Sequence, residues 1–307
     1  MKKISLSLIF LLILSLCTAC NVPPSPLEGT LVEDALGNAV LIPESPRVVS
    51  CYGSFADCWL LSGGSLVGVT EDAVEEGIVS ESEVTVVGSV KSVNLERIIA
   101  LDPDFVILSA DLAAHLKLRD ALEAAKIPHG YFRVDSFSDY KALMAQFCAV
   151  NHGEDAFERY VTRVESDIRD LMARLPSESD LDFLLVRVYS TGMKAKTEDN
   201  LAGQILAEFA LHNVASQHPS LLEDLSVEQV IRSDPDFIFA LAMGSEDAAE
   251  EYLRLNVENN PAWSGLSAVK NGNYHLLPKD LFHYKPNERW AESYEYLAKI
   301  IYPDLFE

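Results

Sequence analysis

Six basic side chains are the first candidates for binding chemistry, because they gather in a few segments of a strongly acidic chain. The sequence holds 47 acidic residues against 24 Lys and Arg, a formal net charge of −23. Cationic side chains hold carboxylates through charge-assisted hydrogen bonds, so the cluster predicts an anionic ligand, such as an acidic metal chelate or a tetrapyrrole carboxylate. Lysines also populate any exposed loop, which is the alternative explanation. The six residues are Lys91, Lys194, Lys196, Lys279, His283 and Lys285.

Several other side chains of the same segments are candidates for ligand contact. Tyr52, Tyr189 and Phe282 offer flat apolar faces to a large ring, and each can equally pack at the base of a loop. Thr70 stands in the short polar segment TED, and we count it among the ligand-binding residues. Arg289 follows the Lys-Pro-Asn turn and either faces the ligand or pairs with a neighbouring acid.

Motifs for catalysis or for a metal centre are weak. The seven histidines form no H-x-H or H-E-x-x-H pattern, so we expect no metal site and no cofactor, although a bare-metal site across a cleft stays open. The sequence contains no G-x-S-x-G elbow and no phosphate-binding G-x-x-x-x-G-K loop. The competing class is an exported hydrolase, which needs a nucleophile with a base in reach. We therefore expect a binding protein and not an enzyme.

The N-terminus predicts export. Two lysines precede an apolar run of residues 4–16 and the small residues before Cys20, the pattern of a secretory signal over residues 1–19. The ending Thr18-Ala19-Cys20 resembles a bacterial lipobox, with Cys17 where a leucine usually stands. We expect lipidation of Cys20 and a flexible Pro-rich tether over residues 20–29, and hence a lipid-anchored protein on the outer face of the cell membrane. Ordinary cleavage to a free secreted protein is the alternative.

Charge and cysteine content narrow the class further. The acidity argues against a nucleic-acid partner, which requires a basic face. After Cys20 the chain has three cysteines, Cys51, Cys58 and Cys148, an odd number that cannot complete a disulfide framework. A Cys51–Cys58 bridge is geometrically possible, but we favour buried thiols.

These side chains must be held by alternating strands and helices. A small hairpin is expected over residues 30–45, followed by the strand PRVVS, a helix capped by Ser54, and further strands that alternate with helices. Such alternation predicts an α/β fold with mainly parallel sheets. In a parallel sheet, ligands bind beyond the carboxyl ends of the strands, which is where most of the candidate segments lie.

One helix-to-strand unit occurs twice. The stretch NLERIIALDPDFVIL, residues 94–108, aligns without gaps with SVEQVIRSDPDFIFA, residues 226–240. In this alignment Glu96 corresponds to Glu228, and the two DPDF segments coincide. The repeat predicts two lobes of the same architecture.

A long amphipathic helix is expected between the lobes. Residues 153–176 contain no internal Gly or Pro after Gly153, and their apolar side chains recur every three or four residues. The predicted domains are an N-terminal lobe over 30–152, this linking helix over 153–176, and a C-terminal lobe over 177–307.

The paired segments resemble those of substrate-binding proteins of bacterial ABC importers, in the subgroup that serves vitamin B12, haem and iron–siderophore complexes. The resemblance covers essentially the whole mature chain. It implies two Rossmann-like lobes joined by a single long α-helix, a ligand cleft between them, and an ABC permease in the membrane as partner. It also implies that Glu96 and Glu228 dock against arginines of that permease. The alternative is that each glutamate only stabilises the N-terminus of its own helix through the helix dipole. We expect a monomer that carries an iron–siderophore, haem or corrinoid; another small anion or a bare metal is the alternative ligand.

Overall fold

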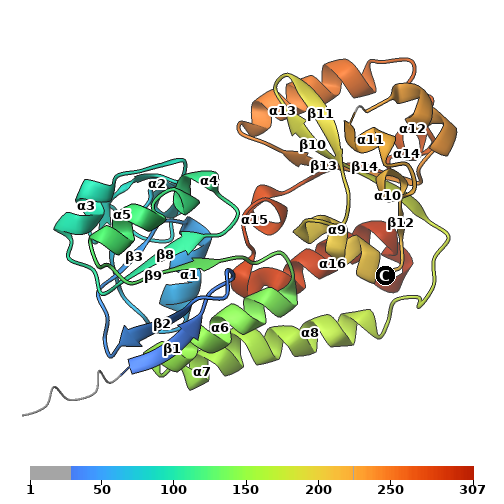
Figure 1. The fold of residues 1–307 in the computed structure, drawn as a ribbon. Helices are drawn as coiled ribbons and strands as arrows, with labels where there is room; N and C mark the ends of the chain where they lie inside the picture. Colours follow the sequence, from blue (N-terminus) through green and yellow to red (C-terminus); the bar gives the residue numbers. More distant parts are fainter. Residues whose placement is uncertain (1–28, 224) are drawn as a thin grey trace, which may run out of the picture.

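The computed structural model describes residues 29–223 and 225–307. Two α/β lobes stand above a layer of helices, and the helical segment of residues 154–172 runs beneath both lobes (Figure 1). The predicted signal, Cys20 and nearly all of the predicted tether lie outside the described residues. Gly29, which we assigned to the tether, is already the first residue of a strand.

A two-stranded hairpin opens the N-terminal lobe, as predicted. Strand β1 (Gly29–Glu33) pairs antiparallel with β2 (Ala39–Pro43). Val32 and Ile42 are buried in the core, while the outward pair Leu31 and Leu41 is exposed. The turn is held by Asp34, whose carboxylate accepts hydrogen bonds from the turn and from the backbone N–H of Tyr131.

The N-terminal lobe is built on a five-stranded parallel sheet of order β5-β4-β3-β8-β9. Its strands are β3 (Val48–Ser50), β4 (Leu66–Val69), β5 (Thr85–Val86), β8 (Phe105–Ser109) and β9 (His129–Phe132), with a small hairpin of β6 (Gly88–Ser89) and β7 (Ser92–Val93). Its helices are α1 (Gly53–Leu61), α2 (Glu71–Glu75), α3 (Leu95–Ala100), α4 (Ala113–Leu116), α5 (Arg119–Ala124) and α6 (Phe137–Asn151). Helices α4 and α5 are separated by Lys117 and Leu118.

The C-terminal lobe carries the second sheet, of order β11-β10-β13-β14 with β12 beside β10. Its strands are β10 (Asp182–Tyr189), β11 (Gly192–Lys196), β12 (His212–Asn213), β13 (Phe237–Ala242) and β14 (Tyr274–Leu277). Its helices are α9 (Leu201–Glu208), α10 (Val214–Gln217), α11 (Ser220–Glu223), α12 (Val227–Ser233), α13 (Glu246–Leu253) continued by a π-turn (Arg254–Glu258), α14 (Ser267–Lys270), α15 (Lys279–Phe282) and α16 (Trp290–Ile301). Strand β11 is antiparallel to β10, a pairing that we did not predict.

The linking helix forms where the apolar spacing placed it. It comprises α7 (Glu154–Phe157), a π-turn (Glu158–Thr162) and α8 (Arg163–Met172) in succession. The side chains of Val161, Val164, Ile168 and Leu171 are buried, and α8 packs against α16. The prediction of a continuous amphipathic connection is confirmed, with one wide turn inside it.

The repeated sequence unit is also a repeated structural unit. The carboxylate of Asp104 accepts the backbone N–H of Arg47 at 2.8 Å, just before β3, and Asp236 accepts that of Asp182, at the start of β10, at the same distance. In each lobe the second aspartate of DPDF therefore pins the start of the neighbouring strand. This shared contact explains why the motif occurs twice.

The lobes share one core. A continuous cluster of buried apolar residues extends from the inner face of the first sheet through α6, α8 and α16 to the inner face of the second sheet. The indole of Trp290, at the start of α16, meets the rings of Phe137 and Tyr140 from the N-terminal lobe. The outer face of each sheet has its own separate cluster. The connection between the lobes is thus a packed interface as well as a single helix.

Two local expectations in the N-terminal lobe need comment. Ser54 is not the cap of α1: Tyr52 is the N-cap residue, and Ser54 lies buried inside the first turn, where its hydroxyl accepts the backbone N–H of Lys285. Cys51, Cys58 and Cys148 are free and buried, so the preference for buried thiols over a Cys51–Cys58 bridge is confirmed.

Candidate functional site

The carboxyl ends of the strands of the two lobes face each other across a gap above α16 and α6 (Figure 1). On the N-terminal side, Tyr52 follows β3, Asp111 follows β8, and Arg133 follows β9. On the C-terminal side, Tyr189 ends β10 and Lys279 begins α15 directly after β14. A cavity lined by residues of both lobes, among them Ser54, Glu76 and Lys285, lies here, and we take its surroundings as the candidate ligand cleft.

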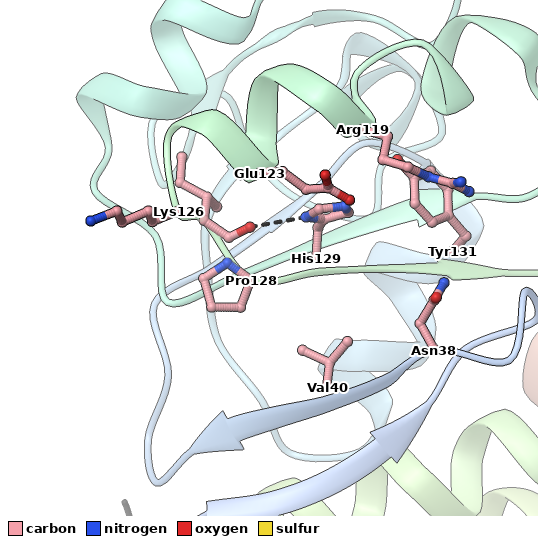
Figure 2. Close-up of a pocket in the computed structure, with 9 residues that line it drawn as sticks. Asn38, Val40, Arg119, Glu123, Lys126, Pro128, His129 and Tyr131 are labelled. Atoms are coloured by element: carbon pink, nitrogen blue, oxygen red, sulfur yellow. Dashed lines mark hydrogen bonds between the residues drawn. The ribbon is translucent and has the colours of Figure 1, made fainter.

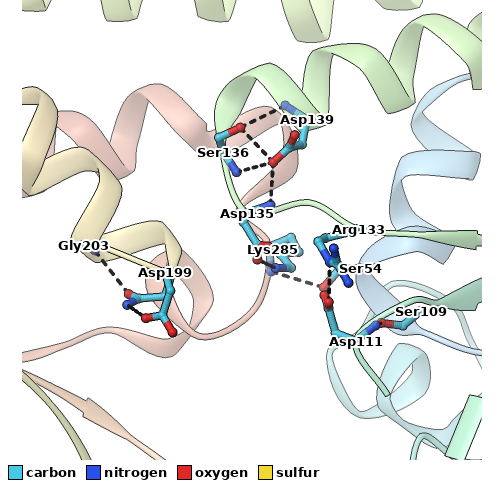
Figure 3. A network of polar contacts seen from close by, with 11 residues as sticks. Ser54, Ser109, Asp111, Arg133, Asp135, Ser136, Asp139, Asp199, Gly203 and Lys285 are labelled. Carbon is cyan, nitrogen blue, oxygen red and sulfur yellow. Dashed lines mark hydrogen bonds and ion pairs between the residues drawn. The ribbon is translucent and has the colours of Figure 1, made fainter. Parts of the chain in front are cut away.

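The N-terminal wall is acidic. The pKa of the half-buried Tyr52 hydroxyl is raised by burial and by the negative charges of Asp72, Glu76, Asp111 and Asp135. The carboxylate of Asp111 lies 2.5 Å from Nε of Arg133, and Figure 3 shows this ion pair. The wall therefore combines one aromatic side chain with four carboxylates, of which one has an arginine partner on the same lobe.

Two of these carboxylates are unusual. Asp72 accepts the backbone N–H of Gly53 at 2.6 Å, and its second oxygen is buried without a hydrogen-bond partner in the described part of the chain. Burial, together with the charges of Asp72, Asp57 and Glu75, raises the pKa of Glu76 to about 7. Glu76 therefore holds a proton in the folded protein under mildly acidic conditions.

The C-terminal wall is cationic. Burial, and then the positive charges of Lys279, Arg187 and Lys285, lower the pKa of His283 to about 4. His283 is consequently neutral at physiological pH, and the wall takes its charge from the three other side chains. Arg187 is paired in the sheet through its backbone, but its guanidinium makes no hydrogen bond or ion pair with any residue of 29–223 or 225–307, which leaves the guanidinium available to a ligand.

Polar contacts join the two walls at the base of the cleft. The ammonium of Lys285 lies 3.3 Å from the carboxylate of Asp135 (Figure 3). The side-chain amide of Asn287 donates to the backbone oxygen of Ser54 at 2.9 Å and to Asp57 at 2.6 Å, and its oxygen accepts the thiol of Cys58 at 3.2 Å. A cavity of about 270 Å³ lies beside this junction and is lined from both lobes.

Tyr52, His283 and Lys285 lie on the walls described above, and their contact with a ligand stays a prediction. Tyr189 stands at the carboxyl end of β10, half-buried, as expected. Lys91 is exposed in the turn between β6 and β7. His115 holds this turn: its Nε2 donates to the backbone oxygen of Val90, and its Nδ1 accepts the backbone N–H of Ser109.

We expected Lys194 and Lys196 in a strand-end loop, but the structure places them elsewhere. Both lie on β11, which turns back along the edge of the sheet because Tyr189 and Gly192 pair across a two-residue turn. Lys196 is already paired with Asp199 at 2.8 Å, and Lys194 is exposed on the edge strand. The hairpin sets Lys194 directly across from Arg187 on the neighbouring strand, so Lys194 stays beside a cation of the C-terminal wall, although it lies on an edge strand and not in a loop.

Three further candidates are placed differently from our expectation. Thr70 follows β4 but is fully buried, so its hydroxyl does not reach the cleft. Phe282 is buried at 4% exposure and packs against Tyr296, a core contact. Arg289 is paired with Asp280 and Glu292, which is the second of the two roles that we considered for it.

Sequence reasoning missed Arg187, Asp111 and Arg133. Arg187 stands inside the run FLLVRVY, and a lone arginine near the end of an otherwise apolar strand is a usable signal, because burying an unpaired charge is costly unless it reaches a polar site. Arg133 is likewise a lone arginine near the end of an apolar segment, GYFRV. We read both segments only as strands.

The two repeated glutamates are exposed on equivalent helices. Glu96 lies in the first turn of α3 and Glu228 in the first turn of α12, and neither carboxylate makes a hydrogen bond or ion pair within the described residues. The side chains of Asn94 and Ser226 cap the two helices in the same way, each accepting the N–H three residues on. The helices lie at the far ends of the two lobes (Figure 1).

A second hollow, of about 420 Å³, lies outside the cleft (Figure 2). It is formed between β2 and α5, with Arg119 stacked over the ring of Tyr131 and His129 bonded to the Ile127 oxygen. Pro128 and His129 precede or begin β9, so the hollow lies toward the amino end of the parallel strands. That is the side opposite to the one where ligands of α/β sheets bind.

Among the residues that the structure describes, no group of three or more His, Cys, Asp or Glu side chains is arranged to hold a metal ion. Within residues 29–223 and 225–307, no helix is long and apolar enough to cross a bilayer.

Comparison with known proteins gives consistent matches. The family model described as periplasmic binding protein matches residues 48–281. The Fe(3+)-citrate-binding protein YfmC of Bacillus subtilis is 26% identical over 265 residues, which cover 82% of this chain and 79% of the relative. The putative ABC transporter substrate-binding lipoprotein YhfQ of the same organism is 27% identical over 90% of this chain and 91% of the relative. The periplasmic catecholate-siderophore binding protein VctP of Vibrio cholerae has the same fold, with a TM-score of 0.70 at 17% identity over 88% of this chain and 100% of that chain.

Proposed function

This chain belongs to the periplasmic binding protein family, and from that premise we propose that it captures an anionic iron chelate in its cleft and delivers it to an ABC permease. The relatives are solute-binding proteins, which confirms the expectation of a binding protein and leaves the hydrolase alternative without support. The relative YfmC is named for binding ferric citrate. A further Bacillus subtilis relative, YclQ, 23% identical over 89% of this chain and 90% of its own length, is named for binding petrobactin. These names favour an iron chelate over haem or a corrinoid.

The observation that carries the proposal is the cationic wall of the C-terminal lobe. Arg187 has no partner among the described residues, while Lys279 and Lys285 stand close enough to lower the pKa of His283. Of these three like charges, Lys285 is partly balanced by Asp135, and an anion placed between them is stabilised by each. A polycarboxylate or catecholate complex of Fe(III) supplies such an anion.

The test is a ligand titration of the purified protein with ferric citrate, a ferric catecholate, haemin and cyanocobalamin, followed by intrinsic fluorescence and by visible absorbance. We expect binding of an anionic ferric complex, and a roughly 10- to 100-fold weaker affinity in Arg187→Gln and in Lys285→Met, since each loses a charge-assisted bond of about 1.5 to 3 kcal/mol. Lys299→Gln, on the solvent side of α16, is the matched control. Tight binding of haemin or cobalamin alone, or unchanged affinity in both variants, contradicts the proposal.

Export and anchoring are the second part of the proposal. The relative YhfQ is named a lipoprotein, and this chain has an apolar run followed by Cys20 and a Pro-rich segment. We propose that Cys20 is lipidated and holds the binding protein on the outer face of the membrane. Cys20→Ala is expected to release the protein into the soluble fraction; retention in membranes would argue against a lipid anchor.

Docking is the third part. We propose that the protein acts as a monomer, with Glu96 and Glu228 each meeting a cation of the permease. Both carboxylates are exposed and unpaired within the described residues, and neither borders the cleft residues named above. We expect Glu96→Ala and Glu228→Ala to leave ferric-chelate affinity unchanged and to lower transporter ATPase stimulation, with the double variant lower than either. Normal stimulation by the double variant would contradict this role.

A further inference from the structure

Ile99 and Ile231 are the two isoleucines that remain exposed in the part of the chain that the structure describes. Their exposures are 46% and 45%. They occupy the same position of the repeated unit, three residues after Glu96 and Glu228 respectively. A single exposed apolar side chain is ordinary, but this one recurs in both lobes at the same place and to the same extent.

Packing within the fold does not explain why these two positions carry isoleucine. The residue immediately before each of them, Ile98 or Val230, is fully buried and anchors its helix to the sheet. Ile99 and Ile231 themselves belong to none of the three apolar clusters and are not packed against any of them. Replacing them with polar residues would therefore cost the folded state little.

Each isoleucine shares a helix face with a glutamate. Residues separated by three positions lie on the same side of an α-helix, about one turn apart. Glu96 and Ile99 thus form one exposed pair on α3, and Glu228 and Ile231 form its counterpart on α12. The other surface positions of the two helices differ: Arg97 corresponds to Gln229, and Ala100 to Arg232.

We infer that each Glu–Ile pair is a two-part contact for the permease, in which the carboxylate meets a cation and the isoleucine enters an apolar socket beside it. This inference rests on the proposed docking function and extends it to a new pair of residues. Because the surface is presented twice with the same chemistry, the partner must offer the same socket twice. A permease made of two equivalent membrane subunits related by a twofold axis has that property.

The two halves of the contact differ in their response to salt. The attraction between Glu96 or Glu228 and a cation is screened as ionic strength rises, whereas apolar burial is not. Charge mainly speeds and orients association, while a buried side chain slows dissociation. These differences allow the isoleucines to be tested separately from the glutamates.

The experiment measures binding of the full-length protein to the permease–ATPase complex of its own importer in nanodiscs, at several salt concentrations. The variants are Ile99→Ser, Ile231→Ser and their double; Leu31→Ser with Leu255→Ser, two other exposed apolar positions, is the matched control. We expect each isoleucine variant to bind about fivefold more weakly and the double about 25-fold, through faster dissociation and with an unchanged salt slope. Thermal unfolding and the control are expected to match wild type.

The outcomes separate this inference from the proposed function. If Glu96→Ala with Glu228→Ala weakens binding and flattens the salt slope while the isoleucine double variant stays within twofold of wild type, the apolar half of the contact is wrong and the glutamates stand. If neither double variant weakens binding, α3 and α12 are not the docking surface and both ideas fall. Weakening by the Leu31 and Leu255 control equal to that by the isoleucines would also overturn the inference.

Discussion

Glu76 and His283, on opposite sides of the cleft, both resist ionisation. For His283 the cause is burial followed by the charges of Lys279, Arg187 and Lys285, which hold its pKa at about 4. For Glu76 it is burial followed by the charges of Asp72, Asp57 and Glu75, which hold its pKa at about 7. The cleft therefore carries its permanent positive charge on the C-terminal lobe, and part of the acidic charge opposite is neutralised below neutral pH.

Glu76 makes the free energy of unfolding depend on pH. Its carboxyl has a higher pKa in the folded chain than its ordinary value of 4.5, so the folded state holds the proton more tightly, and stability falls as pH rises from about 4.5 to about 7. Glu76→Gln should abolish this loss. We expect the variant to be more stable than wild type at pH 8 by about 1 kcal/mol, or about 2 °C in Tm, after allowing for partial solvent screening.

The same measurement includes two checks on Glu76. The difference between Glu76→Gln and wild type should vanish near pH 4, where both side chains are uncharged. Glu71→Gln, an exposed residue at the start of α2 that is not among the charges acting on Glu76, should show no such gain. A pH-independent difference between wild type and Glu76→Gln in thermal unfolding would mean that packing, and not charge, is responsible.

At the scale of elements, the DPDF segments are the joints that set each helix against its strand. Asp102 and Asp234 adopt positive φ values of 47° and 41°, which end the helix, and two residues later Asp104 or Asp236 bonds to the start of the adjacent strand. Aspartate tolerates the left-handed conformation better than most residues because its short side chain bonds locally. The motif thus combines a helix stop with a strand clamp.

Removing the clamp should destabilise both lobes by similar amounts. We expect Asp104→Ala and Asp236→Ala each to lower the free energy of unfolding by about 1 to 2 kcal/mol, because a backbone N–H loses its acceptor. Asp104→Asn and Asp236→Asn keep an acceptor oxygen and should lose less. Urea unfolding measures the difference, with Asp120→Ala, an exposed aspartate on α5, as the control. Equal losses for the Ala and Asn variants would show that the carboxylate acts in some other way.

On the scale of the whole molecule, the lobes are coupled more firmly than a single linking helix requires. The chain returns from the second lobe to the first through Lys285, Asn287 and Trp290, each of which contacts the N-terminal lobe. A common apolar core runs beneath the cleft. Domains that share a large apolar interface move little relative to each other, so ligand capture here should require only small adjustments.

Spin labels on Lys126→Cys and Lys270→Cys, two exposed positions on opposite lobes, report the interlobe distance. We expect a narrow distance distribution that shifts by only a few Å, on the order of 2 to 4 Å, when ferric citrate is added. Asn287→Ala, which removes the bonds to Ser54 and Asp57, should broaden the distribution without ligand. A large closure in the unmodified protein, or no broadening in the variant, would show that the joint is not what limits the motion.

Local patterns in the sequence were enough for the elements and the plan of the molecule. Apolar spacing located the linking helix, alternation predicted parallel sheets, and the DPDF repeat predicted two lobes, because each of these depends on neighbours within about one element of the chain. Glu96 and Glu228 were found in the same way, as matching positions of a repeat. Residues 1–28, with Cys20, lie outside the described residues, so the predictions about them rest on the sequence alone.

The chemistry of the cleft depended on the tertiary structure. Lys194 was predicted in a loop but lies on a strand opposite Arg187, because β11 folds back on β10. Arg187 joined the candidate cations because it lies close enough to His283 to lower the pKa of that imidazole, although His283 comes nearly a hundred residues later. Phe282 became a core residue only when α16 packed over it. Whether a side chain faces ligand, core or another charge is set by segments far away in the sequence, and burial and ion pairing are properties of that assembled environment, which no local pattern contains.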